Sequence, residues 1–327
     1  MLSRAQRVTA IVAGILALLA PLLLVRISPT TAYLRVLLDA SHGAIFAGVA
    51  ILLAQLFRPT RASAREGAWP DWTRYAQVLT ICIALGALIE LLQGLEGRPP
   101  SFFDVMTDTA GALVGLAAGR LATRPRDSAP RRSSSPGFWS VVGLGLVGLA
   151  WVLWRPLHAA TAYAHRAAIF PVIAEFNQPL DRYFTTADGV AVAITELPAP
   201  WSRLPGERAI ELRYAPGHPP DVQIVEPQGD WRGYHVIAAD LTNAGPTELA
   251  LVFRILDAQH DWSGEDRLNL PLVIPPRTRT TVRVALEAVE AAPASRRMDM
   301  ARIANVMLFG NTATASGALY VSRIWLE

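Results

Sequence analysis

The chain has 327 residues, of which 52% are hydrophobic and 17% charged, and its formal net charge is +3 at pH 7. This apolar content exceeds that of an ordinary soluble protein and lies mainly in the first half, so the length is best divided between a membrane domain and a soluble domain. No basic patch with interleaved aromatic residues occurs, which argues against a nucleic-acid partner. The single cysteine, Cys82, excludes a disulfide within the chain.

Five apolar stretches are long enough to cross a bilayer. They cover residues 8–25, 34–57, 75–95, 102–121 and 138–154. A cleaved signal peptide is the alternative for the first stretch, but Arg26 follows it at once without a small-residue cleavage site. The sequence therefore predicts a five-span helical domain over residues 1–155.

The distribution of arginine predicts the orientation of these spans. Arg4 and Arg7 precede the first stretch, and the linkers after the second and fourth stretches are rich in arginine. The other two linkers contain or border only Arg26, Arg35 and Arg98. Because arginine-rich linkers remain in the cytoplasm, we expect a cytoplasmic N-terminus and an extracytoplasmic C-terminal half.

Polar residues interrupt the apolar stretches in pairs that share a helix face. The pairs are Asp39 with His42, Glu90 with Gln93, and Asp104 with Asp108. In the expected topology all of them lie at the outer end of their spans, next to a turn that contains Arg98 and Ser101. Ionisable side chains cost about 2.5–3.5 kcal/mol each at the bilayer centre, so such residues favour a functional site over a network that only locks the helices together.

This predicted site is compatible with several chemistries. Four carboxylates are unbalanced against one histidine and one arginine, and clustered acids either retain a proton or recruit a cation. His42 with Asp39, Glu90 or Asp104 suits general acid/base catalysis. The same side chains suit a divalent metal ion, but histidine with carboxylates is too common a set of ligands to identify a metal site. Arg98 suits a phosphate clamp, or an ion pair with Glu96 or Glu90. We expect no other cofactor.

The first 120 residues also contain a known pattern. Its residues are Asp39, His42, Phe46, Glu90, Gln93, Gly97, Arg98, Ser101, Asp104, Val105, Gly111 and Gly115. Together they resemble the VanZ-like family of small bacterial membrane proteins. The resemblance implies a protein of the bacterial inner membrane and cell envelope, and an association with glycopeptide resistance. Ala40 replaces a frequent lysine and Asp108 a usual asparagine, which puts any lysine-dependent activity in doubt.

The rest of the chain changes character after a polar linker at residues 127–136. We expect residues 156–169, with His158, Tyr163 and His165, to form a short amphipathic connector. From residue 170 to 327 the apolar residues alternate, for example at Ile210, Leu212 and Tyr214. Short alternating segments separated by Pro/Gly turns predict a β-sandwich.

The C-terminal half resembles galactose-binding-like jelly-roll domains, the fold of many carbohydrate-binding modules. The segments that carry the resemblance are residues 229–234, 254–260, 266–269 and 319–326. The resemblance implies carbohydrate as a ligand, and the candidate contacts are Trp262, Asp257, Asp266 and Asn269. Two other expectations concern this half: Trp231 and Tyr234 pack the core, and Asp257, Asp261 and Asp266 are an alternative calcium site.

Three functions fit these features. The first, which we favour, is recognition of a lipid-linked glycan or phospholipid head group at the outer leaflet, with the β-sandwich holding the glycan. The second is an enzyme that hydrolyses or transfers at a phosphate of a polyprenyl or glycan substrate, with His42 and a carboxylate as acid and base. The third is a structural assembly factor of an exopolysaccharide system. No zinc-protease or serine-hydrolase motif is present.

Overall fold

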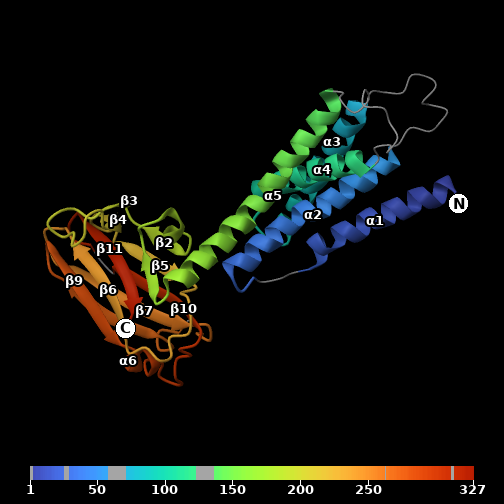
Figure 1. The fold of residues 1–327 in the computed structure, drawn as a ribbon. Helices are drawn as coiled ribbons and strands as arrows, with labels where there is room; N and C mark the ends of the chain where they lie inside the picture. Colours follow the sequence, from blue (N-terminus) through green and yellow to red (C-terminus); the bar gives the residue numbers. More distant parts are fainter. Residues whose placement is uncertain (1–2, 26–28, 58–70, 123–135, 262, 311–312) are drawn as a thin grey trace. The chain divides into compact units, whose positions relative to one another are not determined.

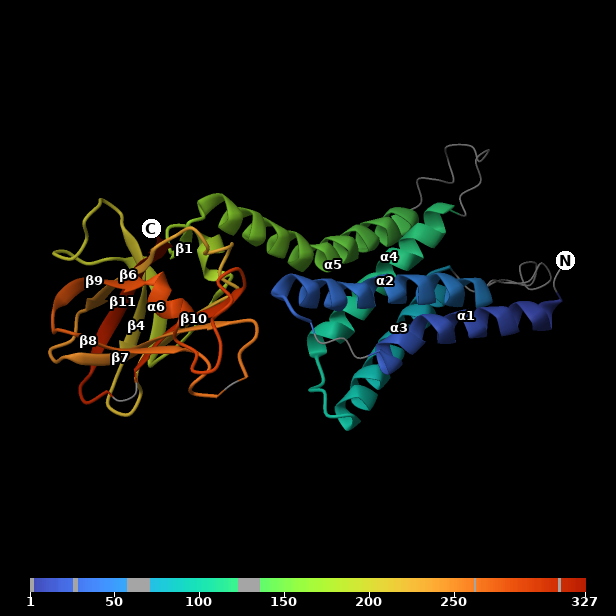
Figure 2. The same cartoon turned by 90° about the horizontal axis from the view of Figure 1, so that it is seen from below.

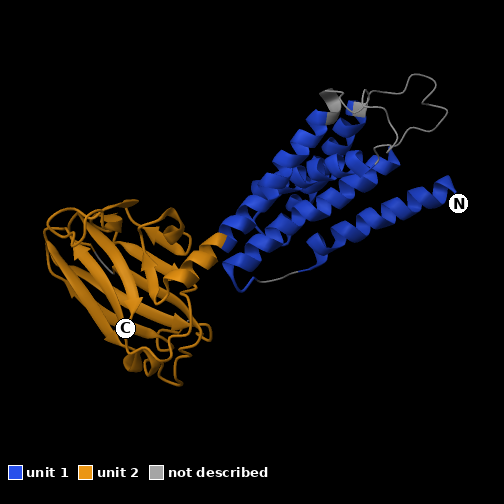
Figure 3. Cartoon of the chain, viewed as in Figure 1, with its two compact units in different colours: residues 1–160 blue, residues 161–327 orange. Residues whose placement is uncertain are grey.

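The computed structural model describes residues 3–25, 29–57, 71–122, 136–261, 263–310 and 313–327. Most of the arginine-rich linkers, the polar linker at 127–135 and Trp262 lie outside the described residues. The chain divides into two units, residues 1–160 and residues 161–327 (Figure 3). The first unit is helical and the second contains the strands.

Five long helices account for the apolar segments (Figure 1). They are α1 (Arg4–Leu24), α2 (Ala32–Leu56), α3 (Asp71–Leu95), α4 (Phe102–Ala122) and α5 (Pro136–Ile169). Ser3 caps α1 through a reciprocal pair of hydrogen bonds with Gln6, and the Thr31 hydroxyl caps α2.

By length and composition, four of the described helices could span a membrane: α1, α2, α3 and α5. Composition and length therefore support four of the five expected spans, and α4 is not among them. That helix carries Asp104, Asp108 and Arg120 among several glycine and threonine residues, which lower its mean hydropathy.

Helix α5 is longer than the sequence predicted. The expected span ended at residue 154, yet the helix passes through Pro156 and ends at Ile169. The segment expected as a connector is thus the last part of α5. Proline removes one backbone hydrogen bond from a helix interior, and the alanine-rich sequence after Pro156 maintains the helix beyond it. The boundary between the two units falls within α5.

Helices α2 and α4 approach each other through small residues. A Cβ atom added to Gly111 would overlap the backbone carbonyl of Gly43, and one added to Gly115 would overlap that of Ala47. Gly119, the third glycine at this spacing, has no atom near its Cβ position. Two of the three glycines therefore allow a close contact between the helices.

The second unit is a β-sandwich of two antiparallel sheets (Figure 2), which confirms the predicted fold class of this half. One sheet has the order β3 (Ala191–Glu196), β4 (Arg208–Tyr214), β11 (Gly317–Leu326), β6 (Val236–Asn243) and β9 (Thr278–Ala285), with β1 (Val172–Glu175) also on β11. The other has the order β2 (Thr185–Asp188), β5 (Asp221–Val225), β10 (Ile303–Gly310), β7 (Leu249–Asp257) and β8 (Leu268–Ile274).

The sandwich core lies between the inner faces of the sheets. Strand β7 shows the alternation clearly, because Leu251, Phe253 and Ile255 are buried while the residues between them are more accessible. Trp231 is completely buried and Tyr234 packs against the core cluster, as expected. A short helix, α6 (Leu286–Glu290), follows β9, so Leu286 belongs to this helix and not to the strand.

The α2–α4 contact predicts unequal effects of one substitution at two glycines of the same helix. Gly111→Ala places a methyl group against the α2 backbone and should destabilise the helical unit by about 1–3 kcal/mol. Gly119→Ala meets open space and should be neutral or stabilise by up to about 1 kcal/mol. Thermal unfolding of both variants in detergent measures the difference, and equal melting temperatures would contradict the assigned contact.

Candidate functional site

The helical unit brings most of the predicted polar residues together. Asp39 and His42 come from α2, Glu90 from α3, and Asp104 and Asp108 from α4. His42 interacts electrostatically with Glu90, Asp104 and Asp108, and Asp104 interacts with Asp39. We call these five residues, together with Arg155 of α5, the acidic cluster.

The centre of the acidic cluster is a buried contact between His42 and Asp108. The His42 Nδ1 and Asp108 Oδ1 atoms are 3.4 Å apart, and the Asp108 side chain has no exposed surface. Neither oxygen of this carboxylate accepts a hydrogen bond from the described part of the chain. Gly86 of α3 provides the room for Asp108, because a Cβ atom there would lie 2.7 Å from Oδ2.

Glu90 joins the end of α3 to the beginning of α4. Its Oε2 accepts a 2.6 Å hydrogen bond from the backbone N–H of Ser101, and the Ser101 hydroxyl accepts one of 3.2 Å from the N–H of Asp104. Ser101 therefore acts as a helix cap. The second oxygen of Glu90, Oε1, is buried and has no hydrogen-bond partner among the described residues.

Arg155 supplies a cation that the sequence analysis did not identify. Its Nη1 atom lies 3.0 Å from Asp39 Oδ2, and its guanidinium lies 4.5 Å from the centre of the Phe103 ring. The excess of carboxylates in the predicted site was a signal that a further cation was required. Spacing alone did not identify Arg155, because it lies more than a hundred residues after Asp39.

Two of the predicted site residues have other partners. Gln93 donates a 3.0 Å hydrogen bond to the backbone carbonyl of Leu22 and so connects α3 to α1. Arg98 lies 3.5 Å from Glu96, one of its two expected partners, with both side chains partly exposed. Arg98 therefore does not neutralise the carboxylates of the acidic cluster.

No group of three or more histidine, cysteine, aspartate or glutamate side chains in the described ranges is arranged to hold a metal ion. The residues of the acidic cluster are close enough to interact electrostatically, but they do not converge as metal ligands do. The divalent cation considered from the sequence has no assigned position.

A second candidate site lies on the outer face of the five-stranded sheet. The strand register places Gln223, Met307, Arg254 and Asn269 in one row across β5, β10, β7 and β8. The adjacent row consists of Asp221, Phe309, Val252 and Pro271. All of these side chains point away from the core, because their neighbours along each strand are the buried residues. We call this surface the sheet face.

Arg254 occupies the middle of the sheet face in a defined orientation. Its guanidinium lies 4.5 Å from the centre of the Phe309 ring, and its Nε donates a 2.7 Å hydrogen bond to Asn269 Oδ1. Burial and the nearby Asp188 raise the pKa of Asp221 above its usual range. Asn269, a carbohydrate candidate from the sequence, thus lies on this face and is exposed.

The candidates Asp257 and Asp266 instead belong to an ion-pair network. Arg296 donates hydrogen bonds of 2.6 and 2.8 Å to the two oxygens of Asp257 and one of 2.7 Å to Asp266. Burial alone would raise the pKa of Asp257, but the hydrogen bonds from Arg296 and from two backbone N–H groups hold it below its ordinary value. A calcium ion at these carboxylates would have to displace Arg296.

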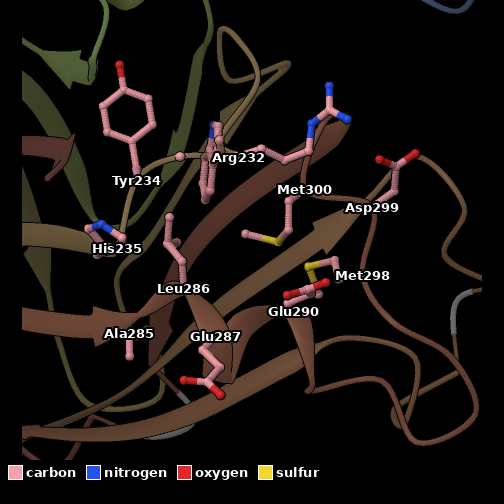
Figure 4. Close-up of a pocket in the computed structure, with 12 residues that line it drawn as sticks. Arg232, Tyr234, His235, Ala285, Leu286, Glu287, Glu290, Met298, Asp299 and Met300 are labelled. Carbon is pink, nitrogen blue, oxygen red and sulfur yellow. The ribbon is translucent and has the colours of Figure 1, made fainter.

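The second unit also contains a cavity of about 610 Å³ next to α6 (Figure 4). Its walls include Trp231, Tyr234 and Met300, and the carboxylates of Glu287 and Glu290. Part of the wall therefore comes from residues 229–234, one of the segments that suggested a jelly-roll domain. The indole N–H of Trp231 is buried and has no hydrogen-bond partner in the described structure.

No protein-family model matches the chain, and no curated protein matches it. Solved structures with a similar fold cover the C-terminal β-sandwich. An exo-β-agarase has 12% identity over 48% of this chain and 24% of its own, with a TM-score of 0.38. A family 11 carbohydrate-binding module from Clostridium thermocellum, solved with a mixed-linked tetrasaccharide, has 16% identity over 47% and 93%, with a TM-score of 0.35. A cellulose-specific module of family 28 has 14% identity over 49% and 93%, also with a TM-score of 0.35.

The Arg296 network predicts different effects of the same change at neighbouring positions. Arg296→Met leaves the fully buried Asp257 without its cation and should destabilise the sandwich by about 3 kcal/mol. Arg297→Met removes an exposed contact with Glu290 and should change stability by less than about 0.5 kcal/mol. Chemical denaturation of the full chain compares the two variants, and a harmless Arg296→Met would show that the network is not structural.

Proposed function

We propose that this protein is anchored in the bacterial inner membrane, and that its β-sandwich binds carbohydrate through the sheet face. The observation that carries the proposal is the pair of rows on the five-stranded sheet, where Phe309 and Met307 lie beside Arg254, Gln223 and Asp221. Sugar rings present apolar C–H faces bordered by hydroxyl groups. A surface that combines aromatic and apolar side chains with fixed polar groups complements both features.

The geometry of Arg254 supports binding because its orientation is set before a ligand arrives. Phe309 supports one face of the guanidinium and Asn269 accepts from Nε. Guanidinium has five N–H donors in a rigid plane, so donors remain for hydroxyl oxygens. Asp221 and Gln223 add carboxylate and amide groups on β5, on the other side of β10. Little side-chain freedom would be lost when a sugar binds there.

For the helical unit, we propose that the acidic cluster recognises the head group of a phospholipid or a lipid-linked glycan at the outer leaflet. The buried carboxylates of Asp108 and Glu90, with oxygens that accept no hydrogen bond from the described residues, support a ligand site over a closed structural network. This proposal relies on the topology expected from the arginine distribution, and it requires α4 to cross the membrane packed against the other helices although its own composition is less apolar than theirs. It also agrees with the cell-envelope role that the resemblance to VanZ-like proteins implies.

Two alternatives make different predictions for the same protein. A phosphate-transferring or hydrolysing enzyme would release product from undecaprenyl-linked substrates and lose that activity in His42→Ala. An assembly factor of an exopolysaccharide system would hold a stable protein partner without measurable affinity for glycans. Binding of glycans without turnover favours the recognition function over both.

The sheet face is tested with two arginines that each lie over an aromatic ring, one on each sheet. Arg254→Ala or Phe309→Ala should weaken glycan binding by about tenfold or more, because each removes a central contact. Arg323, which lies 5.3 Å from the centre of the Trp325 ring on the six-stranded sheet, provides the control Arg323→Ala and should leave binding unchanged. A glycan array with the purified full chain identifies the ligand, and titration measures the affinities. Equal affinities for all variants would overturn the assignment of the sheet face.

A further inference from the structure

We propose that the acidic cluster binds a primary ammonium group, as carried by an aminophospholipid or an amino sugar. This inference rests on the proposed role of the cluster as a head-group site, and it narrows the ligand from any head group to one with a positive charge. An ammonium site also differs from a phosphate clamp, which was one of the alternatives that the sequence left open for Arg98.

The acidic side chains of the cluster outnumber the basic ones, which favours a positively charged ligand. Its acidic members are Asp39, Glu90, Asp104 and Asp108, and its basic members are Arg155 and His42. Arg155 pairs with Asp39. The remaining three carboxylates share one histidine, so two negative charges lack a partner when all three are ionised and His42 is protonated. Charges in such surroundings are costly unless an opposite charge accompanies them.

The burial of Asp108 and Glu90 points to a ligand independently of this charge balance. Asp108 has no exposed surface and Glu90 is 4% exposed. Three of their four carboxylate oxygens accept no hydrogen bond from the described residues, although Asp108 Oδ1 lies 3.4 Å from His42 Nδ1 and the fourth oxygen, on Glu90, accepts a short hydrogen bond from Ser101. A primary ammonium carries three N–H donors and no acceptor, which matches a site made of unused carboxylate oxygens.

Other ligand chemistries fit the described cluster less well. A phosphate would face uncompensated carboxylates, and the nearby arginines are engaged, since Arg98 pairs with Glu96 and Arg155 with Asp39. A quaternary ammonium prefers open aromatic faces, whereas the Phe103 ring is covered by Arg155 and stacks on Trp151. The absence of a metal-like ligand group among the described residues argues for an ammonium over a metal ion.

The exposures of the side chains indicate a direction of entry. Arg155 and Asp39 are 40% and 29% exposed, His42 is 13% exposed, and Asp108 is fully buried. The Arg155–Asp39 pair thus forms the accessible rim of the cluster, and Asp108 forms its closed end. A head group that enters between them would meet increasingly buried carboxylates.

The test uses the full chain with Arg254→Ala, so that sugar binding at the sheet face does not contribute. Short-chain phosphatidylethanolamine is compared in detergent with phosphatidylcholine and phosphatidylglycerol, and glucosamine with N-acetylglucosamine, by calorimetric titration. We expect the amine in at least one series to bind about tenfold or more tightly than its matched compounds. Tight binding of phosphatidylethanolamine identifies a lipid source, and tight binding of glucosamine identifies an amino sugar.

Substitutions assign the binding to the cluster. Asp108→Asn keeps the shape but removes the charge, and should reduce amine affinity by about tenfold or more. Glu96→Gln, at a partly exposed glutamate outside the cluster, is the control and should bind normally. Melting temperatures establish that the variants fold, and Glu90→Gln replaces Asp108→Asn if the latter does not fold.

The outcomes separate this inference from the proposed function. If choline or glycerol lipids bind as tightly as phosphatidylethanolamine and Asp108→Asn abolishes binding of all three, the head-group site stands and the ammonium inference is wrong. If no lipid or sugar distinguishes the parent protein from its cluster variants, both the ligand site and the inference fail.

Discussion

The close approach of α2 and α4 is the constraint on which the polar site of the helical unit depends. Gly111 and Gly115 lie so near the backbone of α2 that a single methyl group would overlap it. Asp108 and Asp104 lie three and seven residues before Gly111, on the same side of α4 and nearer its start, and Asp39 stands one turn before Gly43 on α2. The contact between α2 and α4 is therefore tightly packed at the glycines and polar nearer the start of α4, where His42 contacts Asp108. A wider separation of the helices would disperse the acidic cluster.

The chemistry of the acidic cluster depends on which carboxylate oxygens have a partner in the protein and which do not. Helix capping by Ser101 uses one oxygen of Glu90, and Arg155 neutralises Asp39. Asp108 receives only the neighbouring histidine. Buried polar groups in folded proteins are usually hydrogen-bonded, so these exceptions are the strongest indication that the cluster has a role beyond holding helices together.

The β-sandwich shows how different partners give similar side chains different roles. Arg296 lies among Asp257 and Asp266, where its donors satisfy buried carboxylates and contribute to the stability of the domain. Arg254 lies on an accessible surface over Phe309, where donors remain available to a ligand. Both residues stand beside acidic or amide partners in the folded chain. Both arginines are half-buried, so the partners that occupy their donors, and not residue type, separate the structural arginine from the candidate binding arginine.

Local patterns in the sequence were sufficient for the types of element and for much of the helical site. Long apolar runs predicted helices, alternation predicted the strands of the sandwich, and spacings of three and four residues paired Asp39 with His42 and Asp104 with Asp108. These features depend on neighbours within one or two turns, so they can be recognised without the fold. The number of apolar helices and the end of α5 were misjudged, because Asp104, Asp108 and Arg120 lower the hydropathy of α4 and Pro156 does not end a helix that its flanking residues favour.

Tertiary structure alone decided which distant residues meet. Arg155 and Asp39 are 116 positions apart, and Arg296 and Asp257 are 39 apart. The sheet face requires the strand order β5–β10–β7–β8, which places Phe309 beside Val252 although β10 follows β7 by more than 40 residues. Sequence spacing determines which side of a helix or strand a residue occupies. Core packing and strand register decide which element packs against that side, because many pairings are compatible with the same local sequence pattern and only one of them forms a well-packed core.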